Sequence, residues 1–358
     1  MSIFLNGIGL VAPTGRGIDS LASALESGWR PPLPLAIPGA AHLPAYILPP
    51  DVFADKSLGR KVRRSDRLSK MAVFAASDAL VDAQLPANLD RRRIGLVVST
   101  AFGSHATTFQ FLDEILTYGD PGVSPTVFSH SVQNAPASYI ASTLDLQGPA
   151  LTLTQVHFGF HNALLIARHW LASGRCDYVL AGGMDELGSV MNYICRSLLR
   201  TPADGKLRPF DFAKHPAAIP GEGSAFFLLS ASPQPAPYAR LGQITTTSRT
   251  PPIAPPTLHI LEADGSLPDE SAYSAPAAAT APLAAYSPLF GTMPGGSPLH
   301  AAAAALMLKR QVCFASPVAD ATTLPVCSET TQKPLASILL TRLHCNGALG
   351  QIELLTPA

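Results

Sequence analysis

Residues 148–167 of the 358-residue chain read GPALTLTQVHFGFHNALLIA, and this stretch governs how the rest of the sequence is interpreted. A short apolar strand, Ala150–Thr154, is followed by an apolar helix predicted over Phe160–Ser173, and His157 lies in the turn between them. Many enzymes hold a nucleophile at such a turn, because the free amides and positive dipole of the helix start stabilise negative charge and lower the pKa of a thiol. Here the turn carries an imidazole instead.

The flanking sequence alternates strands and helices up to about residue 230. Apolar runs predict strands, and a 3.6-residue spacing of apolar side chains predicts helices. The predicted strands are Ile3–Val11, Ile94–Ser99 and Tyr178–Ala181, and the predicted helices are Gly17–Ser27, Arg67–Ala83 and Ala135–Leu144. Because these strands are continuous apolar runs between helices, we expect an α/β fold with a mainly parallel sheet covered on both faces.

The composition changes after Leu229. Two segments, 232–256 and 274–298, are rich in Pro, Ala and Ser in a chain with 34 prolines, which predicts long stretches without regular structure. Regular structure returns in a helix predicted over Leu299–Gln311 and in a strand pair, Ala336–Leu343 and Gln351–Leu355.

The charge balance excludes several classes of partner. Lys plus Arg and Asp plus Glu number 25 each, so nothing favours a nucleic acid or an anionic membrane surface. Only 14% of residues are charged and 47% are hydrophobic, which indicates that a partner subunit covers part of the surface. Residues 1–13 lack the basic region of a signal peptide and no stretch has the length of a membrane span, so we expect a cytoplasmic protein.

Five cysteines, at positions 176, 195, 313, 327 and 345, are widely spaced and form no Cys-x-x-Cys pair. This pattern predicts neither a disulfide framework nor a zinc site. We expect small buried residues in a reducing compartment.

Six motifs occur in one order along residues 1–230: Leu5–Pro13, Arg64–Ser69, Val123–Ala167, Asp177–Asp185, Arg208–Asp211 and Gly221–Ala225. Together they resemble a β-ketoacyl synthase of the thiolase-like superfamily. The resemblance implies a duplicated thiolase-like fold with α-β-α-β-α layers, an N-terminal half over residues 1–231 and a truncated C-terminal half over residues 232–358. Relative to the family, a surface helix is missing between Leu229 and Glu262.

The same resemblance implies three catalytic positions, a cysteine that carries the acyl chain and two histidines that assist decarboxylation. In this chain they fall on His157, Asp264 and Gly296, with Gly291 at the position of the family's lysine. The glycine-rich gate loop falls on Cys345–Ala348, so that Asn346, followed by Gly347, replaces the gating phenylalanine. Acyl-imidazoles hydrolyse easily and no donor remains to stabilise an enolate, so we expect no catalytic residue.

His157 has three readings: a filler of a vacated pocket, a base with altered chemistry, or a metal ligand together with His161 one helical turn away. No third ligand is evident, so no metal and no cofactor are predicted. The positive helix start favours a neutral imidazole. Asp264 is expected to be solvated or hydrogen-bonded, and its pairing with Glu262 as two glycosidase-like carboxylates has no other support.

The loss of all three positions resembles the non-catalytic chain length factor, which pairs with an active ketosynthase and serves an acyl carrier protein. In that family the segment around Val127 and Phe128 crosses the dimer interface and limits the partner's acyl tunnel, and Phe109 and Phe111 are further candidates for this role. Small divergent subunits of bacterial aryl polyene pathways are the favoured context. Alternatives are a decarboxylase or atypical acyltransferase acting through His157 on a malonyl or acyl carrier protein, and a synthase that uses Cys345 or Cys195.

Overall fold

The structure is a computed structural model that describes residues 1–37, 40–86, 89–246, 255–278, 281–320 and 323–357. Its strands are β1 (Phe4–Ala12), β2 (Gly15–Arg16), β3 (Leu33–Ile37), β4 (Ala40–Ala45), β5 (Ile94–Thr100), β6 (Ala150–Thr154), β7 (Tyr178–Asp185), β8 (Gly223–Ser230), β9 (Ala239–Thr245), β10 (Leu258–Leu261), β11 (Leu283–Ala284), β12 (Val312–Cys313), β13 (Thr331–Gln332), β14 (Ser337–Leu343) and β15 (Leu349–Leu355). Its α-helices are α1 (Ile18–Ser27), α2 (Lys56–Lys61), α3 (Arg67–Asp82), α4 (His105–Tyr118), α5 (Pro125–Ser131), α6 (Ala135–Leu144), α7 (Gly159–Ala172), α8 (Ser189–Leu198), α9 (Ser274–Ala277), α10 (Ser287–Phe290) and α11 (Ser297–Arg310).

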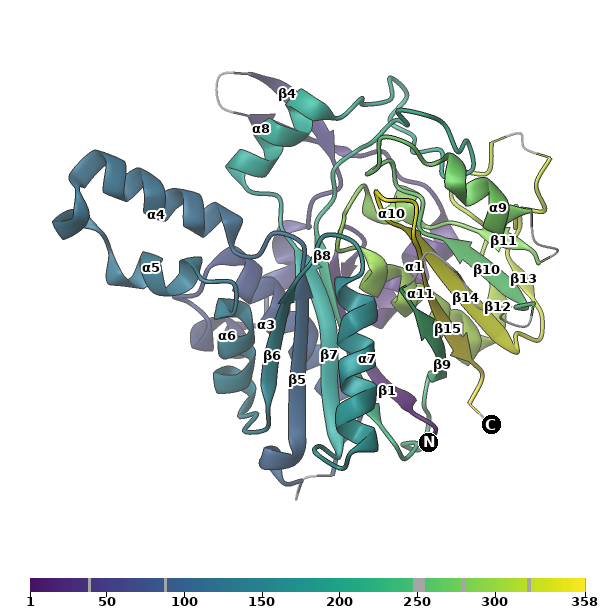
Figure 1. Cartoon of the computed structure of the whole chain (residues 1–358), viewed down its shortest axis with the longest axis horizontal. Coiled ribbons are helices and arrows are strands. Elements are labelled where there is room, and N and C mark those ends of the chain that lie inside the picture. The colour runs from purple at the N-terminus through teal and green to yellow at the C-terminus, as the bar shows by residue number, and fades with distance from the viewer. Residues whose placement is uncertain (38–39, 87–88, 247–254, 279–280, 321–322, 358) are drawn as a thin grey trace.

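The main sheet consists of two five-stranded units with the same order (Figure 1). The first runs β6-β5-β7-β8-β1 and the second β11-β10-β14-β15-β9. In each unit the first three strands are parallel and the last two alternate in direction. The units join edge to edge through two residue pairs of β1 and β9, Phe4 with Arg240 and Leu5 with Ala239. This repetition confirms the expected duplicated α/β fold, while the division at residues 231 and 232 stays a prediction.

Two helices, α7 and α11, lie between the two units and contact strands of both. Five consecutive alanines of α11, Ala301–Ala305, are at most 2% exposed, because only small side chains let a helix approach two sheets at once. On the outer face of the first unit, α3 packs against β1 at backbone distance. A Cβ atom at Gly9 would lie 2.1 Å from the carbonyl oxygen of Ala75, so this strand position requires glycine.

The family motifs form the scaffold of this first unit. Asp66 caps α3, since its side chain accepts a hydrogen bond from the amide of Ser69 at 2.8 Å. The next residue, Arg67, pairs with both carboxylate oxygens of Glu222, which is buried beside β8. The Glu222 carboxylate also accepts hydrogen bonds from the amides of Leu48 and Leu187 at 3.0 Å each. It therefore connects α3 to the loops that carry Leu48, Leu187 and Glu222 itself.

Among the described residues of the second unit, no helix between β9 and β10 corresponds to α3. Residues 246–257 alone connect β9 to β10, whereas residues 13–93 connect the equivalent β1 and β5. The prediction that 232–256 lacks regular structure was wrong, because β9 lies within it; residues 247–254 lie outside the described part. The prediction for 274–298 was also wrong, since α9, β11, α10 and the start of α11 fall there. Proline restricts these elements to short segments without preventing them.

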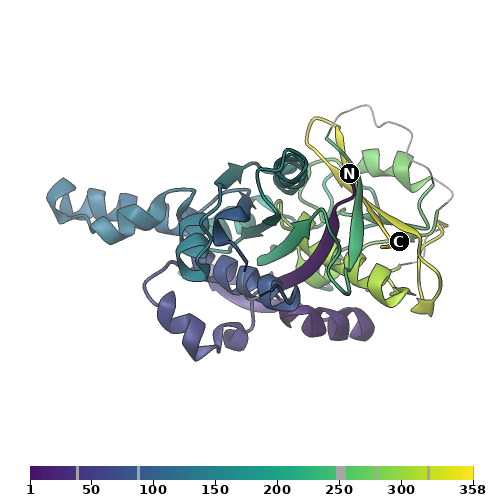
Figure 2. The same ribbon diagram turned by 90° about the horizontal axis from the view of Figure 1, so that it is seen from below.

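One feature extends from the body of the molecule. Helices α4 and α5 form a hairpin, residues 105–131, that projects sideways in both ribbon views; we call it the α4–α5 arm (Figures 1 and 2). It begins directly after β5 and leads through α6 to the edge strand β6.

In the described ranges, no helix combines the length and apolar character that crossing a bilayer requires.

Candidate functional site

His157 lies in the turn between β6 and α7, where the sequence places it. Its side chain is 7% exposed, and its Nδ1 atom has no hydrogen-bond partner among the described residues. The ring of His344 packs edge-on against it, with 4.9 Å between ring centroids. Burial, together with the charge of Arg342, lowers the pKa of His157 to about 4. The imidazole is therefore neutral at pH 7 and a weak base, which suits packing better than proton transfer.

Aromatic side chains fill the start of α7. His161 is fully buried, and neither ring nitrogen has a partner among the described residues. Burial lowers its pKa to about 3. Phe158 packs against both His161 and His344, with 5.3 Å between ring centroids in each case. Within the described ranges, no group of three or more His, Cys, Asp or Glu is placed to bind a metal ion.

The gate-loop segment forms the tight turn between β14 and β15. Gly347 has a φ of +80°, and Asn346 accepts the amide of Ala348 at 3.0 Å, so both residues shape the turn. Asn346 and Gly347 are exposed. The turn does approach His157, but through His344, two residues before Asn346. His344 was not predicted from the sequence, although its place beside the expected loop was a usable signal.

Asp264 is buried and fully hydrogen-bonded rather than solvated. One carboxylate oxygen accepts the amide of Ser266 at 3.0 Å, and the other accepts the amide of Met293 at 3.0 Å and the guanidinium of Arg342 at 3.2 Å. A histidine at this position would offer a proton donor, whereas this carboxylate only accepts. These hydrogen bonds hold the Asp264 side chain in one position.

Arg342, on β14, is the centre of that network and is only 1% exposed. Its guanidinium also lies 3.9 Å from Glu262. Burial raises the pKa of Glu262 to about 7 and that of nearby Glu270 as well, so both carboxyl groups hold protons readily. Arg342 was not predicted from the sequence. The signal was its place as the one charged residue in the apolar run 337–343.

Gly296 is the residue that precedes α11 and offers no side chain to the site. Beside it, Ser297 donates to Glu262 at 2.5 Å and the amide of Gly295 donates to Asp185 at 2.9 Å. One turn into the helix, His300 is buried, and burial lowers its pKa to about 3. The three predicted positions therefore border one buried region that His161, His300, His344 and Arg342 fill.

Two hollows are relevant to the candidate site. One, of about 150 Å³, lies beneath α8 and is lined by apolar side chains together with Asp185, Glu186 and Ser266. Cys195 also lines it, and burial raises the pKa of this thiol to about 11, so it is protonated and a poor nucleophile. The other candidate thiol, Cys345, is exposed beside the hairpin turn.

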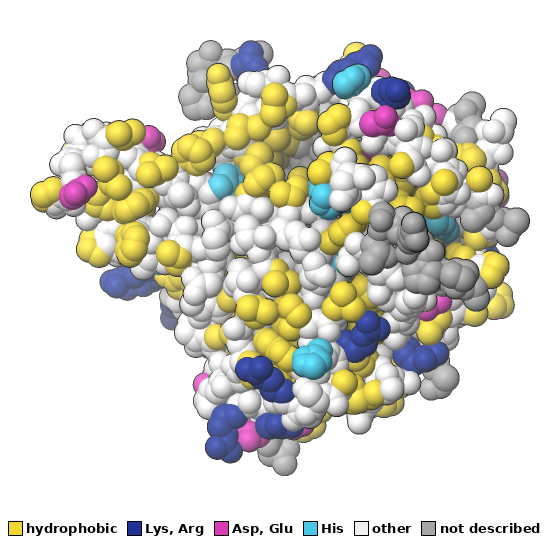
Figure 3. All heavy atoms as spheres, in the orientation of Figure 1, with side chains coloured by type: hydrophobic (Ala, Val, Ile, Leu, Met, Phe, Trp, Pro, Cys, Tyr) yellow, Lys and Arg dark blue, Asp and Glu magenta, His cyan; other side chains and the backbone are white. Residues whose placement is uncertain are grey.

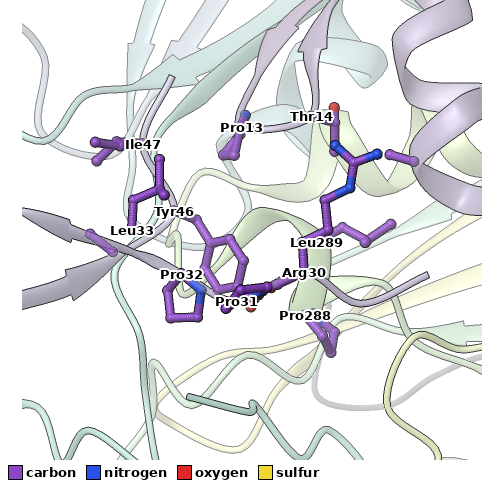
Figure 4. Close-up of a pocket in the computed structure, with 12 residues that line it drawn as sticks. Pro13, Thr14, Arg30, Pro31, Pro32, Leu33, Tyr46, Ile47, Pro288 and Leu289 are labelled. Carbon is purple, nitrogen blue, oxygen red and sulfur yellow. Dashed lines mark hydrogen bonds between the residues drawn. The ribbon is translucent and has the colours of Figure 1, made fainter. Parts of the chain in front are cut away.

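The second hollow, of about 220 Å³, lies between the two halves (Figure 4). Pro13, Thr14 and Tyr46 come from the first half, and Pro288 and Leu289 from the second. Arg30 is the one charged residue in its lining. The lining is rich in proline and contains no pair of side chains that could act as acid and base. This hollow therefore adds nothing to the chemistry around His157.

The α4–α5 arm carries the predicted interface residues. Phe128 is 55% and Phe109 is 42% exposed, Val127 and Phe111 are half-buried, and the rings of Phe111 and Phe128 pack at 5.4 Å. Figure 3 shows hydrophobic side chains gathered over the arm and over α8. The exposed large apolar residues of this region are Phe102, Phe109, Leu112, Leu116, Tyr118, Phe128, Val132, Leu151, Val156, Tyr193, Ile194 and Leu198. Apolar exposure of this density marks an interaction surface.

The scaffold around His157 matches a known protein family. Residues 48–234 match the model of the β-ketoacyl synthase N-terminal domain, which includes the Arg67–Glu222 scaffold, β6 and the turn at His157. The chain belongs to the β-ketoacyl synthase family. It is 27% identical to the polyketide β-ketoacyl synthase 1 of Streptomyces halstedii over 63% of its own length. It is also 27% identical to the actinorhodin polyketide β-ketoacyl synthase 2 of Streptomyces coelicolor over 65% of its length. The chain spans 57% and 59% of these two relatives.

Solved structures of the family share the whole fold. A β-ketoacyl synthase from Burkholderia phymatum superimposes with a TM-score of 0.82 at 18% identity and covers 100% of both chains. The ishigamide ketosynthase/chain length factor gives the same TM-score and identity. This β-ketoacyl synthase family member therefore has the thiolase-like fold, with a buried network of charged and aromatic side chains around His157 and Asp264.

Proposed function

We propose that this chain is a ketosynthase-like subunit that does not itself condense acyl groups. The observation that carries the proposal is the state of His157: buried, neutral and packed under His344 at the position of the acyl-carrying cysteine. Asp264 is held by Arg342, and Gly296 has no side chain, so neither supplies the donors that decarboxylation needs.

The second part of the proposal is that the chain acts as a chain length factor, in a heterodimer with an active β-ketoacyl synthase. Support comes from the edge strand β6 and the adjoining α4–α5 arm. The edge of a sheet offers unpaired backbone groups to a partner strand, and Leu151 on β6 is 38% exposed. In this pairing Val127 and Phe128 would limit the partner's tunnel during elongation on an acyl carrier protein, as in aryl polyene assembly.

Intact-mass measurement tests the first part. The purified chain, incubated with malonyl or acyl carrier protein, should show no covalent adduct and release no carbon dioxide. In a reconstituted complex, His157→Ala should keep turnover within about twofold of the parent. An acyl adduct on the isolated chain that disappears in His157→Ala would instead establish the acyltransferase or decarboxylase alternative.

Coexpression tests the second part. The chain and an active β-ketoacyl synthase should elute as a one-to-one complex, and Leu151→Asp on the edge strand should abolish it. Val81→Asp is the matched control, because Val81 is 73% exposed but lies on α3, outside the arm and β6. A stable homodimer that never associates with a synthase would overturn the pairing.

A further inference from the structure

Two cysteines that are distant in sequence meet in the second half of the fold. The Sγ atoms of Cys313, on β12, and Cys327 lie 3.1 Å apart. This is about 1 Å longer than a covalent S–S bond of about 2.05 Å. We propose that Cys313 and Cys327 form a reversible disulfide, so that the chain carries a redox modification site.

The backbone holds both thiols in place. The amide of Cys327 donates to the carbonyl of Leu283 at 2.8 Å, and its own carbonyl accepts the amide of Ser316 at 2.8 Å. Cys313 pairs with Thr331 across the β12–β13 ladder. Because both chain segments are fixed by hydrogen bonds, closing the bond requires side-chain rotation and little backbone movement.

The two thiols differ in access. Cys313 is fully buried, whereas Cys327 is half-buried and reaches solvent. The hydrogen bond from Cys313 lowers the pKa of the Cys327 thiol, and the nearby Lys333 acts in the same direction. Cys327 is therefore the thiolate that reacts first.

The oxidant is a small external disulfide such as oxidised glutathione. The Cys327 thiolate attacks one of its sulfur atoms, which breaks that S–S bond and releases one glutathione thiolate. Cys313 then loses its proton to solvent and attacks the Cys327 sulfur, which releases the second glutathione. Two protein thiols are oxidised to one disulfide, and one external disulfide is reduced to two thiols.

The bond would connect the end of α11 to the edge of the second sheet unit. Cys313 lies three residues after the end of α11, and Cys327 is hydrogen-bonded to β11, the outermost strand of that unit. A crosslink there restrains the unfolded chain and therefore stabilises the folded state. Reduction would release it.

The experiment uses the full chain with Cys345→Ser, which removes the exposed thiol at the hairpin. The protein is equilibrated with oxidised and reduced glutathione at several ratios, alkylated and mapped by peptide mass spectrometry. We expect a peptide joined through Cys313 and Cys327, protection of these two thiols from alkylation, and a higher Tm in the oxidised sample. Dithiothreitol should reverse all three.

Cys195→Ser is the matched control, since this half-buried cysteine lies outside the pair and should leave the crosslink intact. Cys327→Ser should abolish both the crosslink and the Tm difference. The proposal is overturned if glutathione stays attached to Cys327 without closure, or if both thiols remain alkylatable at every ratio. Peptide mapping of the parent decides this even where Cys327→Ser does not fold.

Discussion

The two halves of this molecule have the same strand order and the same strand directions but differ in what covers them. The first unit carries α3 on its outer face, packed so closely that Gly9 has no room for a side chain. The second unit has only residues 246–257 at the equivalent point. In that unit the buried side chains of His259 and Gln351 both hydrogen-bond to the hydroxyl of Thr341, so its strands hold polar contacts in the interior.

The two halves also differ in where they carry exposed apolar surface and buried charge. The first half holds the α4–α5 arm and β6, and therefore most of the exposed apolar surface. The second half contributes Arg342, on β14, and its carboxylates, which follow the end of β10; all of them are buried in the interior. The exposed apolar surface lies in one repeat, and the buried charged network lies in the other.

The largest effect is expected from Arg342→Met, which removes the buried cation of the second half. Asp264 would remain buried without its partner, so the free energy of unfolding should fall by about 3–5 kcal/mol in urea denaturation. Arg310→Met is the control, because its pair with Glu26 is exposed and should contribute less than about 1 kcal/mol. Equal midpoints for the two variants would contradict a structural role for the network.

Gly9 and Gly242 lie on equivalent strands, β1 and β9, and substitutions there test whether a rigid helix packs against each sheet unit. Gly9→Ala on β1 would force a methyl group against the backbone of α3 and should destabilise the protein by about 2 kcal/mol or more. Gly242→Ala on β9 meets only the flexible side chain of Glu353, so its cost should be below about 1 kcal/mol. Thermal denaturation of both variants compares them, and a reversed order would mean that α3 is not the rigid layer.

The buried histidines of α7 and α11 predict how the stability of the protein depends on pH. His161 of α7 and His300 of α11 both have a pKa lowered to about 3 by burial, so the unfolded chain binds their protons first as pH falls. Their contribution is complete above about pH 6.5 and is lost below it, with a slope of roughly 1 kcal/mol per pH unit for each group. His161→Phe and His300→Phe should each flatten the fall in stability between pH 6.5 and 4 in urea titrations.

The control for this slope is His169→Phe, on the exposed side of α7. It should leave the pH profile of the parent unchanged. If all three variants gave the same profile, buried neutral histidines would not be responsible for acid sensitivity.

The smallest effect on stability is expected at the arm. Phe128→Ala removes a side chain that is 55% exposed, so the free energy of unfolding should change by less than about 0.5 kcal/mol. In the reconstituted complex, however, the same variant should lengthen the products detected by mass spectrometry. A change in stability without a change in product length would make Phe128 a packing residue.

Much of the fold was predictable because apolar periodicity reports burial directly. The predicted boundaries of Ala135–Leu144 and Ala150–Thr154 coincide with α6 and β6, and the predicted pair at residues 336–355 is the β14–β15 hairpin. The strand β9 was not predicted, since a proline-rich flank conceals a short strand whose pairing partners lie at both ends of the chain. The roles assigned to His157, Asp264, Gly296 and the arm residues stay predictions.

The sequence by itself determined the family motifs, the duplicated α/β architecture and the imidazole at position 157, because these depend on local pattern and residue identity. Only the tertiary structure decided that Arg342 reaches Asp264, that His344 covers His157 and that Cys313 meets Cys327. Each of these contacts joins residues from separate strands, helices or loops. His344 reaches His157 only when the two sheet units pack around α7 and α11, whereas the other two contacts form within the second half. No spacing along the sequence encodes any of the three.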